Sequence, residues 1–87
     1  MKVSKRILLS GHDIKDIQHS VLKTGADCKI LSKFVGFFSE KEIIYEIEGE
    51  EELVERVISE LKKACEEWDG SSPYVNSVRA SLEILKP

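Results

Sequence analysis

The sequence predicts an α+β fold in which two helices pack against one face of a four-stranded antiparallel sheet. The first observation is a long amphipathic helix expected over residues 49–68, whose charged residues lie opposite its apolar ones. The second is a set of short segments in which apolar and polar residues alternate, as they do in half-buried strands. The third is the order of these segments along the chain, which is strand-helix-strand-strand-helix-strand. The apolar residues of the long helix are Leu53, Val54, Val57, Ile58, Leu61, Ala64, Cys65 and Trp68.

A first strand is expected over residues 3–9, with Leu8 on its outward side. Ser10 and Asp13 then resemble a capping box with a shortened acid, which predicts the start of a helix. This helix would run for about three turns and end at Gly25, a residue favoured after helix C-termini. Its apolar stripe consists of Ile14, Ile17, Val21 and Leu22.

A second strand is expected over residues 27–34, where alternation places Phe34 on the inward side. A loop over residues 36–41 leads to a third strand over residues 42–48. After the long helix, residues 69–73 combine Asp, Gly, Ser and Pro and predict a turn. The fourth strand is predicted from the alternating apolar residues Val78, Ala80, Leu82 and Ile84.

The simplest arrangement for this order of elements is the ferredoxin-like βαββαβ sandwich, with strand order 4-1-3-2. Parallel strands joined through a helix cross over in the right-handed sense, so both helices are expected on the same face of the sheet. The chain is short enough that residues 1–87 are expected to form one domain.

The composition indicates a globular protein, because 41% of the residues are hydrophobic and 33% are charged. No run approaches the roughly 18 apolar residues of a membrane span, and the N-terminal apolar stretch is too short for a signal peptide. We therefore expect a cytoplasmic protein without a membrane partner. Cys28 and Cys65 are expected to be buried free thiols because they fall on apolar faces and form no CxxC pair.

The charge is distributed unevenly along the chain. Residues 40–69 carry twelve acidic and four basic residues, a net of −8, whereas the whole chain has a net charge of −3. Acidic and aliphatic outward positions on the third strand would repel phosphates and lack the stacking aromatics of an RNA-recognition motif. Nucleic acid is therefore not an expected partner.

A run of carboxylates near the start of the long helix is the first candidate site. Hard cations such as calcium take several oxygen ligands, and carboxylates around Gly49 can supply them. The alternative is ordinary solvated surface, because acids are favoured in the first turn of a helix and pair with bases across strands. The candidate metal residues are Asp27, Glu46, Glu48, Glu50, Glu51 and Glu52.

The open face of the sheet is the second candidate site. Leu8, Leu31 and Ile44 are expected to point outward on adjacent strands, and contiguous exposed aliphatic residues mark binding or subunit surfaces. A homodimer with two-fold symmetry or a protein partner would then cover this interface. The alternative is that long basic side chains lie over these residues.

The sequence contains no nucleophile elbow, phosphate loop or HExxH motif, so we expect a binding protein rather than an enzyme. In length, element order and the acidic run 46–52, the chain resembles small acidic α+β proteins of methanogenic and other thermophilic archaea. That resemblance implies binding of Ca²⁺, and we expect no other cofactor. The bias towards Lys and Glu is typical of heat-adapted proteins and predicts thermostability.

Overall fold

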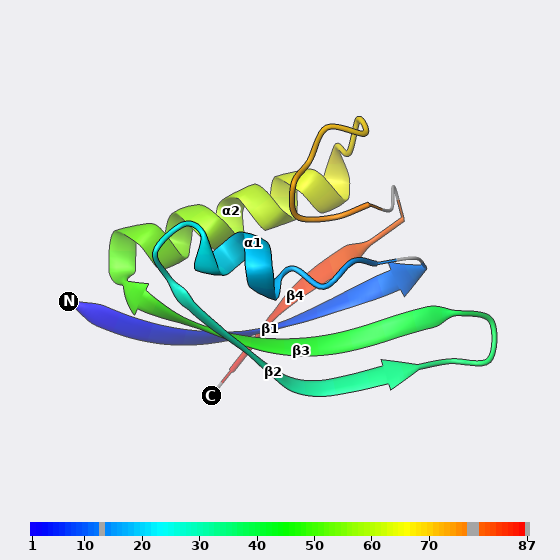
Figure 1. Ribbon diagram of the computed structural model, residues 1–87, viewed down its shortest axis with the longest axis horizontal. Helices are drawn as coiled ribbons and strands as arrows, with labels where there is room; N and C mark the ends of the chain where they lie inside the picture. Colours follow the sequence, from blue (N-terminus) through cyan, green and yellow to red (C-terminus); the bar gives the residue numbers. More distant parts are fainter. Residues whose placement is uncertain (13, 77–78, 87) are drawn as a thin grey trace.

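Two helices and four strands make up the structure, a computed structural model that describes residues 1–12, 14–76 and 79–86. They follow one another in the order β1-α1-β2-β3-α2-β4 (Figure 1). The bounds are Lys2–His12 for β1, Gln18–Leu22 for α1, Asp27–Val35 for β2, Glu40–Glu50 for β3, Glu51–Glu66 for α2 and Ser81–Leu85 for β4. The expected α+β class is therefore confirmed.

The four strands form one antiparallel sheet with the order β2-β3-β1-β4. Read from the other edge, the order is β4-β1-β3-β2. The central pair β1 and β3 is in register along its whole length, from Lys2 opposite Glu50 to His12 opposite Glu40. The expectation of a four-stranded antiparallel sheet with two helices is confirmed.

Both helices lie on the same side of the sheet (Figure 1). The inward side chains of β1 and β3 and the apolar face of α2 form a common core. Five apolar residues of α2 are buried, and the other three that the pattern placed on this face are partly buried against the core. The fully buried residues of the sheet are Ile7, Leu9, Ile43, Tyr45 and Ile47.

The expectation that a helix begins at Ser10 is wrong. Strand β1 continues through this position to His12 because β3 and β4 both supply partners there, and the hydroxyl oxygens of Ser10 and Ser81 lie 2.8 Å apart. The other half of the expected capping box, Asp13, lies outside the described residues. Helix α1 has only five residues instead of three turns. Three residues of the expected apolar stripe, Ile14, Ile17 and Val21, are buried in the core, but the fourth, Leu22, is 46% exposed.

The chain re-enters the sheet through a long connection between α2 and β4. Strand β4 begins at Ser81, and Val78, where the fourth strand was expected to start, lies outside the described residues. Tyr74 and Val75 in this connection are buried against the core, which the turn residues before them did not indicate. Within the described residues, neither helix has the length and apolar content needed to cross a bilayer.

Candidate functional site

A hairpin formed by β2 and β3 extends beyond the part of the sheet that the helices cover (Figure 1). Its turn is closed by the N–H of Gly36, which donates to the carbonyl oxygen of Glu40 at 2.6 Å. The side-chain carboxylate of Glu40 also accepts a hydrogen bond, from the N–H of Phe38 at 3.0 Å. Ser39 has a φ of 67°, the left-handed conformation that tight turns require. These contacts fix the turn backbone without using the phenylalanine rings.

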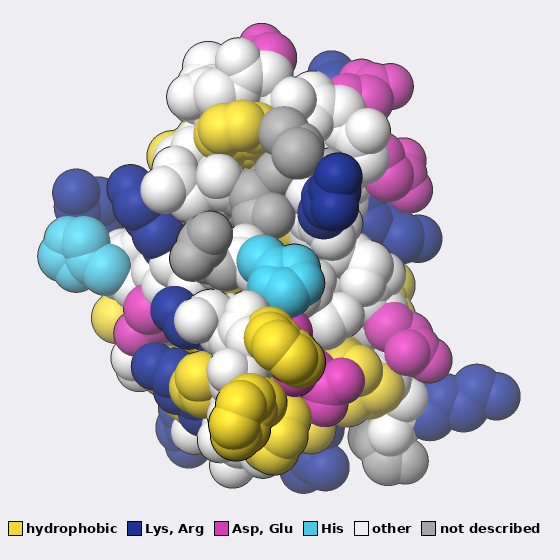
Figure 2. Space-filling model, turned by 90° about the vertical axis from the view of Figure 1, so that its right-hand side faces the viewer, with side chains coloured by type: hydrophobic (Ala, Val, Ile, Leu, Met, Phe, Trp, Pro, Cys, Tyr) yellow, Lys and Arg dark blue, Asp and Glu magenta, His cyan; other side chains and the backbone are white. Residues whose placement is uncertain are grey.

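Large apolar side chains surround this turn and face solvent. Phe37 is 97% exposed and Phe38 is 78% exposed, and their rings meet edge to face with centroids 5.7 Å apart. The two residues that end β2, Phe34 and Val35, are each more than half exposed. We call Phe34, Val35, Phe37 and Phe38 the hairpin tip surface. Figure 2 shows hydrophobic side chains gathered at this end of the molecule.

The position of Phe34 differs from the expectation because β2 contains an irregularity. Ile30 lies opposite Tyr45, but the next paired residue is Ser32, opposite Ile44, so Leu31 is the extra residue of a bulge. An extra residue reverses the alternation of side chains that follows it. Phe34 therefore lies opposite Glu42 on the outward side of the sheet and not on the inward side that simple alternation predicts.

The structure brings together two of the three residues proposed for the open-face interface. Leu8 and Ile44 are directly opposite each other on β1 and β3, and both are partly exposed. Leu31 is 45% exposed but sits in the bulge, and Ser32 takes the place opposite Ile44. The outward aliphatic surface is therefore smaller in the centre of the sheet than expected, and the apolar exposure is concentrated at the hairpin tip.

The acidic residues proposed for a metal site are spread along the outward side and the end of the sheet. Glu46 accepts a hydrogen bond from Arg6 Nε at 3.2 Å, and Glu50 pairs with the N-terminal amine at 2.8 Å. This pairing lowers the pKa of Glu50 and raises the pKa of the amine. Glu51 and Glu52 are exposed in the first turn of α2.

The remaining two acids of this set are neighbours. Asp27 and Glu48 face each other at the paired ends of β2 and β3. Over the part of the chain that the structure describes, no three or more His, Cys, Asp or Glu residues are arranged as a group that could hold a metal ion. The candidate metal residues therefore do not form one cluster: Glu46 and Glu50 have basic partners, and Asp27 and Glu48 face each other.

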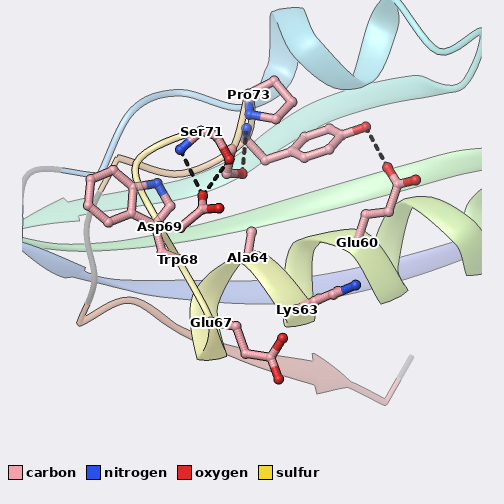
Figure 3. A pocket seen from close by; sticks show the side chains of 10 residues that line it. Glu60, Lys63, Ala64, Glu67, Trp68, Asp69, Ser71 and Pro73 are labelled. Atoms are coloured by element: carbon pink, nitrogen blue, oxygen red, sulfur yellow. Dashed lines mark hydrogen bonds between the residues drawn. The ribbon is translucent and has the colours of Figure 1, made fainter.

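A hollow lies between the C-terminal half of α2 and the connection that follows it (Figure 3). Tyr74 donates a hydrogen bond from its hydroxyl to Glu60 at 3.1 Å, and Asp69 accepts hydrogen bonds from the N–H and the hydroxyl of Ser71. These bonds lower the pKa of Asp69. Trp68 Nε1 is buried and has no hydrogen-bond partner within the described residues. The carboxylates of Glu60 and Asp69 therefore hold the loop in place, and the hollow results from the way in which this loop packs on α2.

Both cysteines are buried and free, as the sequence predicts. Burial raises the pKa of the Cys28 thiol to about 11, with a smaller contribution from the nearby Asp16 carboxylate. Burial likewise raises the pKa of Cys65. Neither thiol is set up as a nucleophile, because the thiolate is the reactive form.

Comparison of the sequence with models of known protein families and with curated proteins gives no match.

Proposed function

We propose that this chain is a non-enzymatic protein-interaction module that binds through the hairpin tip surface. The observation that carries the proposal is the exposure of Phe37 and Phe38 beside Phe34 and Val35 on one protruding hairpin. Soluble proteins seldom expose large contiguous apolar surfaces except where they bind a partner. Aromatic residues, phenylalanine included, are also enriched at the buried centres of protein interfaces.

The turn that carries these residues supports the proposal. Its backbone is held by the hydrogen bonds from Gly36 and Phe38 to Glu40, so little backbone order has to be gained on binding. A phenylalanine ring has few rotatable bonds and loses little conformational entropy when it is covered. Leu8 and Ile44 extend the apolar surface towards the centre of the outward sheet face.

We further propose that the fold is the ferredoxin-like βαββαβ sandwich. Support comes from the two crossovers: β3 lies between β1 and β2, and β1 lies between β3 and β4. Each crossover contains one helix, and both helices are on the same side of the sheet, as right-handed crossovers require (Figure 1). In this arrangement the outward face of the sheet stays open to a partner.

A weak site for a divalent cation, with calcium favoured, is the second candidate function. Asp27 and Glu48 lie directly opposite each other, and like charges at such positions destabilise a sheet. A cation between them would remove this repulsion, and carboxylate oxygens are the ligands that calcium prefers. Glu46 and Glu50 already have basic partners and would contribute less.

Photo-cross-linking in the cells from which the chain originates tests the interaction function. Benzoylphenylalanine replaces Phe37 in one variant and Leu22 in the control, because Leu22 is a half-exposed apolar residue on α1 that lies near the start of β2, at the other end of the hairpin from its tip. We expect a discrete protein adduct from position 37 and none from position 22. The same adducts at both positions, or none at position 37, would contradict the proposed function.

A further inference from the structure

The accessible surface of the molecule is larger than its mass requires. It measures 5738 Å² for a chain of 9.9 kDa, whereas a monomer of this mass has about 5,200 Å² on average. The molecule is correspondingly elongated, with extents of 40 × 26 × 20 Å. The hairpin that projects past the helices lies at one end of the longest dimension, and its tip carries exposed aromatic side chains (Figures 1 and 2).

The apolar area at the tip approaches what a stable dimer needs from each copy. Taking about 200 Å² for each ring, the exposed fractions of Phe34, Phe37 and Phe38 amount to roughly 450 Å². Two copies would therefore bury about 900 Å² from these rings alone, close to the roughly 1,000 Å² that a specific interface should exceed. Val35, about half exposed, supplies the rest.

The charges of the hairpin favour another copy over an anionic lipid surface. Residues 31–42 contain two lysines and two glutamates, so the segment has no net charge and gains nothing from a negative membrane. Lys33 and Glu42 are both exposed at the rim of the tip. A surface that carries both signs can be complementary to itself.

Addition of a partner strand to the edge of the sheet is disfavoured. Strand β2 is an edge strand, but the bulge at Leu31 interrupts its ladder, and Lys29 and Lys33 are exposed along it. Bulges and lysines are features that protect edge strands from pairing with other chains. A contact made at this hairpin would therefore use the side chains of the tip.

We propose that a second copy of this chain covers the hairpin tip surface, with the two hairpins packed tip to tip about a two-fold axis. Phe37 and Phe38 of each copy contact those of the other, and Phe34 and Val35 close the sides of the contact. Such an isologous interface requires only that the patch be complementary to itself. The assignment rests on the interaction function proposed above and names its partner.

Sedimentation equilibrium tests this inference on three purified proteins: the wild type, F37S/F38S and the control L22S. Concentrations should run from about 1 µM to about 500 µM, because an interface of this size gives weak to moderate affinity. We expect the wild type and L22S to be dimers at the upper end. F37S/F38S should dissociate at least about 100-fold more readily, since two central aromatic contacts are lost.

The other outcomes overturn the inference. Three monomeric proteins would show that no second copy binds, and a dimer that survives F37S/F38S would place the contact elsewhere. Far-ultraviolet circular dichroism confirms that the variants are folded, which is expected because Phe37 and Phe38 lie outside the core. A monomeric wild type together with a cross-link from position 37 to a different protein would refute the second copy but leave the interaction function standing.

Discussion

At the scale of single residues, Tyr45 links the sheet to the segment before α1. Its side chain is fully buried, and its hydroxyl oxygen accepts a hydrogen bond from the N–H of Ile17 at 3.3 Å. The same hydroxyl donates to the Asp16 carboxylate at 3.4 Å. Burial raises the pKa of Tyr45 because the phenolate would lose its hydration, and the nearby Asp16 carboxylate acts in the same direction.

The raised pKa of Tyr45 predicts a loss of stability in alkali. The pKa of a tyrosine in the unfolded chain is about 10. At a lower pH, Tyr45 is protonated in both the native and the unfolded state, so the pKa shift does not change the free energy of unfolding. Above about pH 10 the unfolded state releases the proton while the native state keeps it, so the free energy of unfolding falls by up to about 1.4 kcal/mol per pH unit. Y45F should lack this slope and be less stable at neutral pH by about 1 kcal/mol, because the N–H of Ile17 loses its acceptor.

Urea denaturation of the wild type and Y45F at pH 8, 10 and 11 measures both effects. Burial raises the pKa of Cys28 to about 11, so this thiol titrates in both proteins, and the comparison with Y45F removes the part of its effect that does not depend on Tyr45. The free energies of the two proteins should converge as the pH rises above 10. A constant difference between them over this range would contradict the assignment of the slope to Tyr45.

At the scale of elements, the strands differ in how far local sequence determines them. Strand β3 alternates regularly, so Ile43, Tyr45 and Ile47 could be assigned to the core from the sequence. Strand β2 alternates equally well, but the bulge at Leu31 reverses its faces and turns Phe34 outward. A bulge depends on how two strands pair, so the sequence of one strand does not reveal it.

The first helix shows a second limit of local patterns. The spacing of Ile14, Ile17 and Val21 predicted one helical face, and all three residues are buried. Only Gln18–Leu22 is helical, because β1 extends to His12 and residues 14–17 have no regular secondary structure. The pattern therefore identified three of its four core residues correctly, whereas Leu22 is 46% exposed, and it did not predict the backbone that carries them.

The paired ends of β2 and β3 provide the prediction for the cation site. In the labelled protein, calcium should shift the backbone amide resonances of residues 25–28 and 46–50 in a saturable way, with a dissociation constant of about 10⁻⁴–10⁻³ M. D27N should abolish these shifts, because it removes one of the two opposed carboxylates. E55Q is the matched control, since Glu55 is an exposed acid of α2 that the proposed site does not use.

Magnesium serves as a second control in this titration, because it demands a stricter octahedral geometry and gives up its water reluctantly. Spectra that stay unchanged at millimolar calcium would rule out the cation site. Equal shifts in D27N and E55Q would show that the effect comes from general screening of an acidic surface.

At the scale of the whole molecule, the core and the surface were predictable to different degrees. The order of elements and the apolar face of α2 follow from periodicity, which reports directly on burial. The exposure of Phe37 and Phe38 does not follow from it, because a pair of phenylalanines in a loop can equally fold back onto a core. The sequence does show two adjacent aromatic residues between two strands. Whether their side chains face the core or the solvent depends on the turn that Glu40 holds.

The pairing of the acidic residues in the candidate metal site was also predictable only in part from the sequence. The sequence placed Asp27 near Glu48, and the strand register brings them opposite each other. Pairing with bases across the strands was the alternative expected for these acids, and Glu46 pairs with Arg6 in this way, whereas the pairing of Glu50 with the N-terminal amine was not expected. Long-range pairing therefore decides which carboxylates remain available to a ligand.

The central claim is that a second copy covers the hairpin tip surface, and amide chemical-shift mapping on dilution tests it most directly. Spectra of the labelled protein are recorded from about 1 mM down to about 20 µM, a range that spans the dissociation constant of a weak dimer. We expect concentration-dependent shifts at residues 34–42, with smaller changes at Leu8 and Ile44. Spectra independent of concentration, or shifts confined to other surfaces such as α2 and β4, would contradict the account.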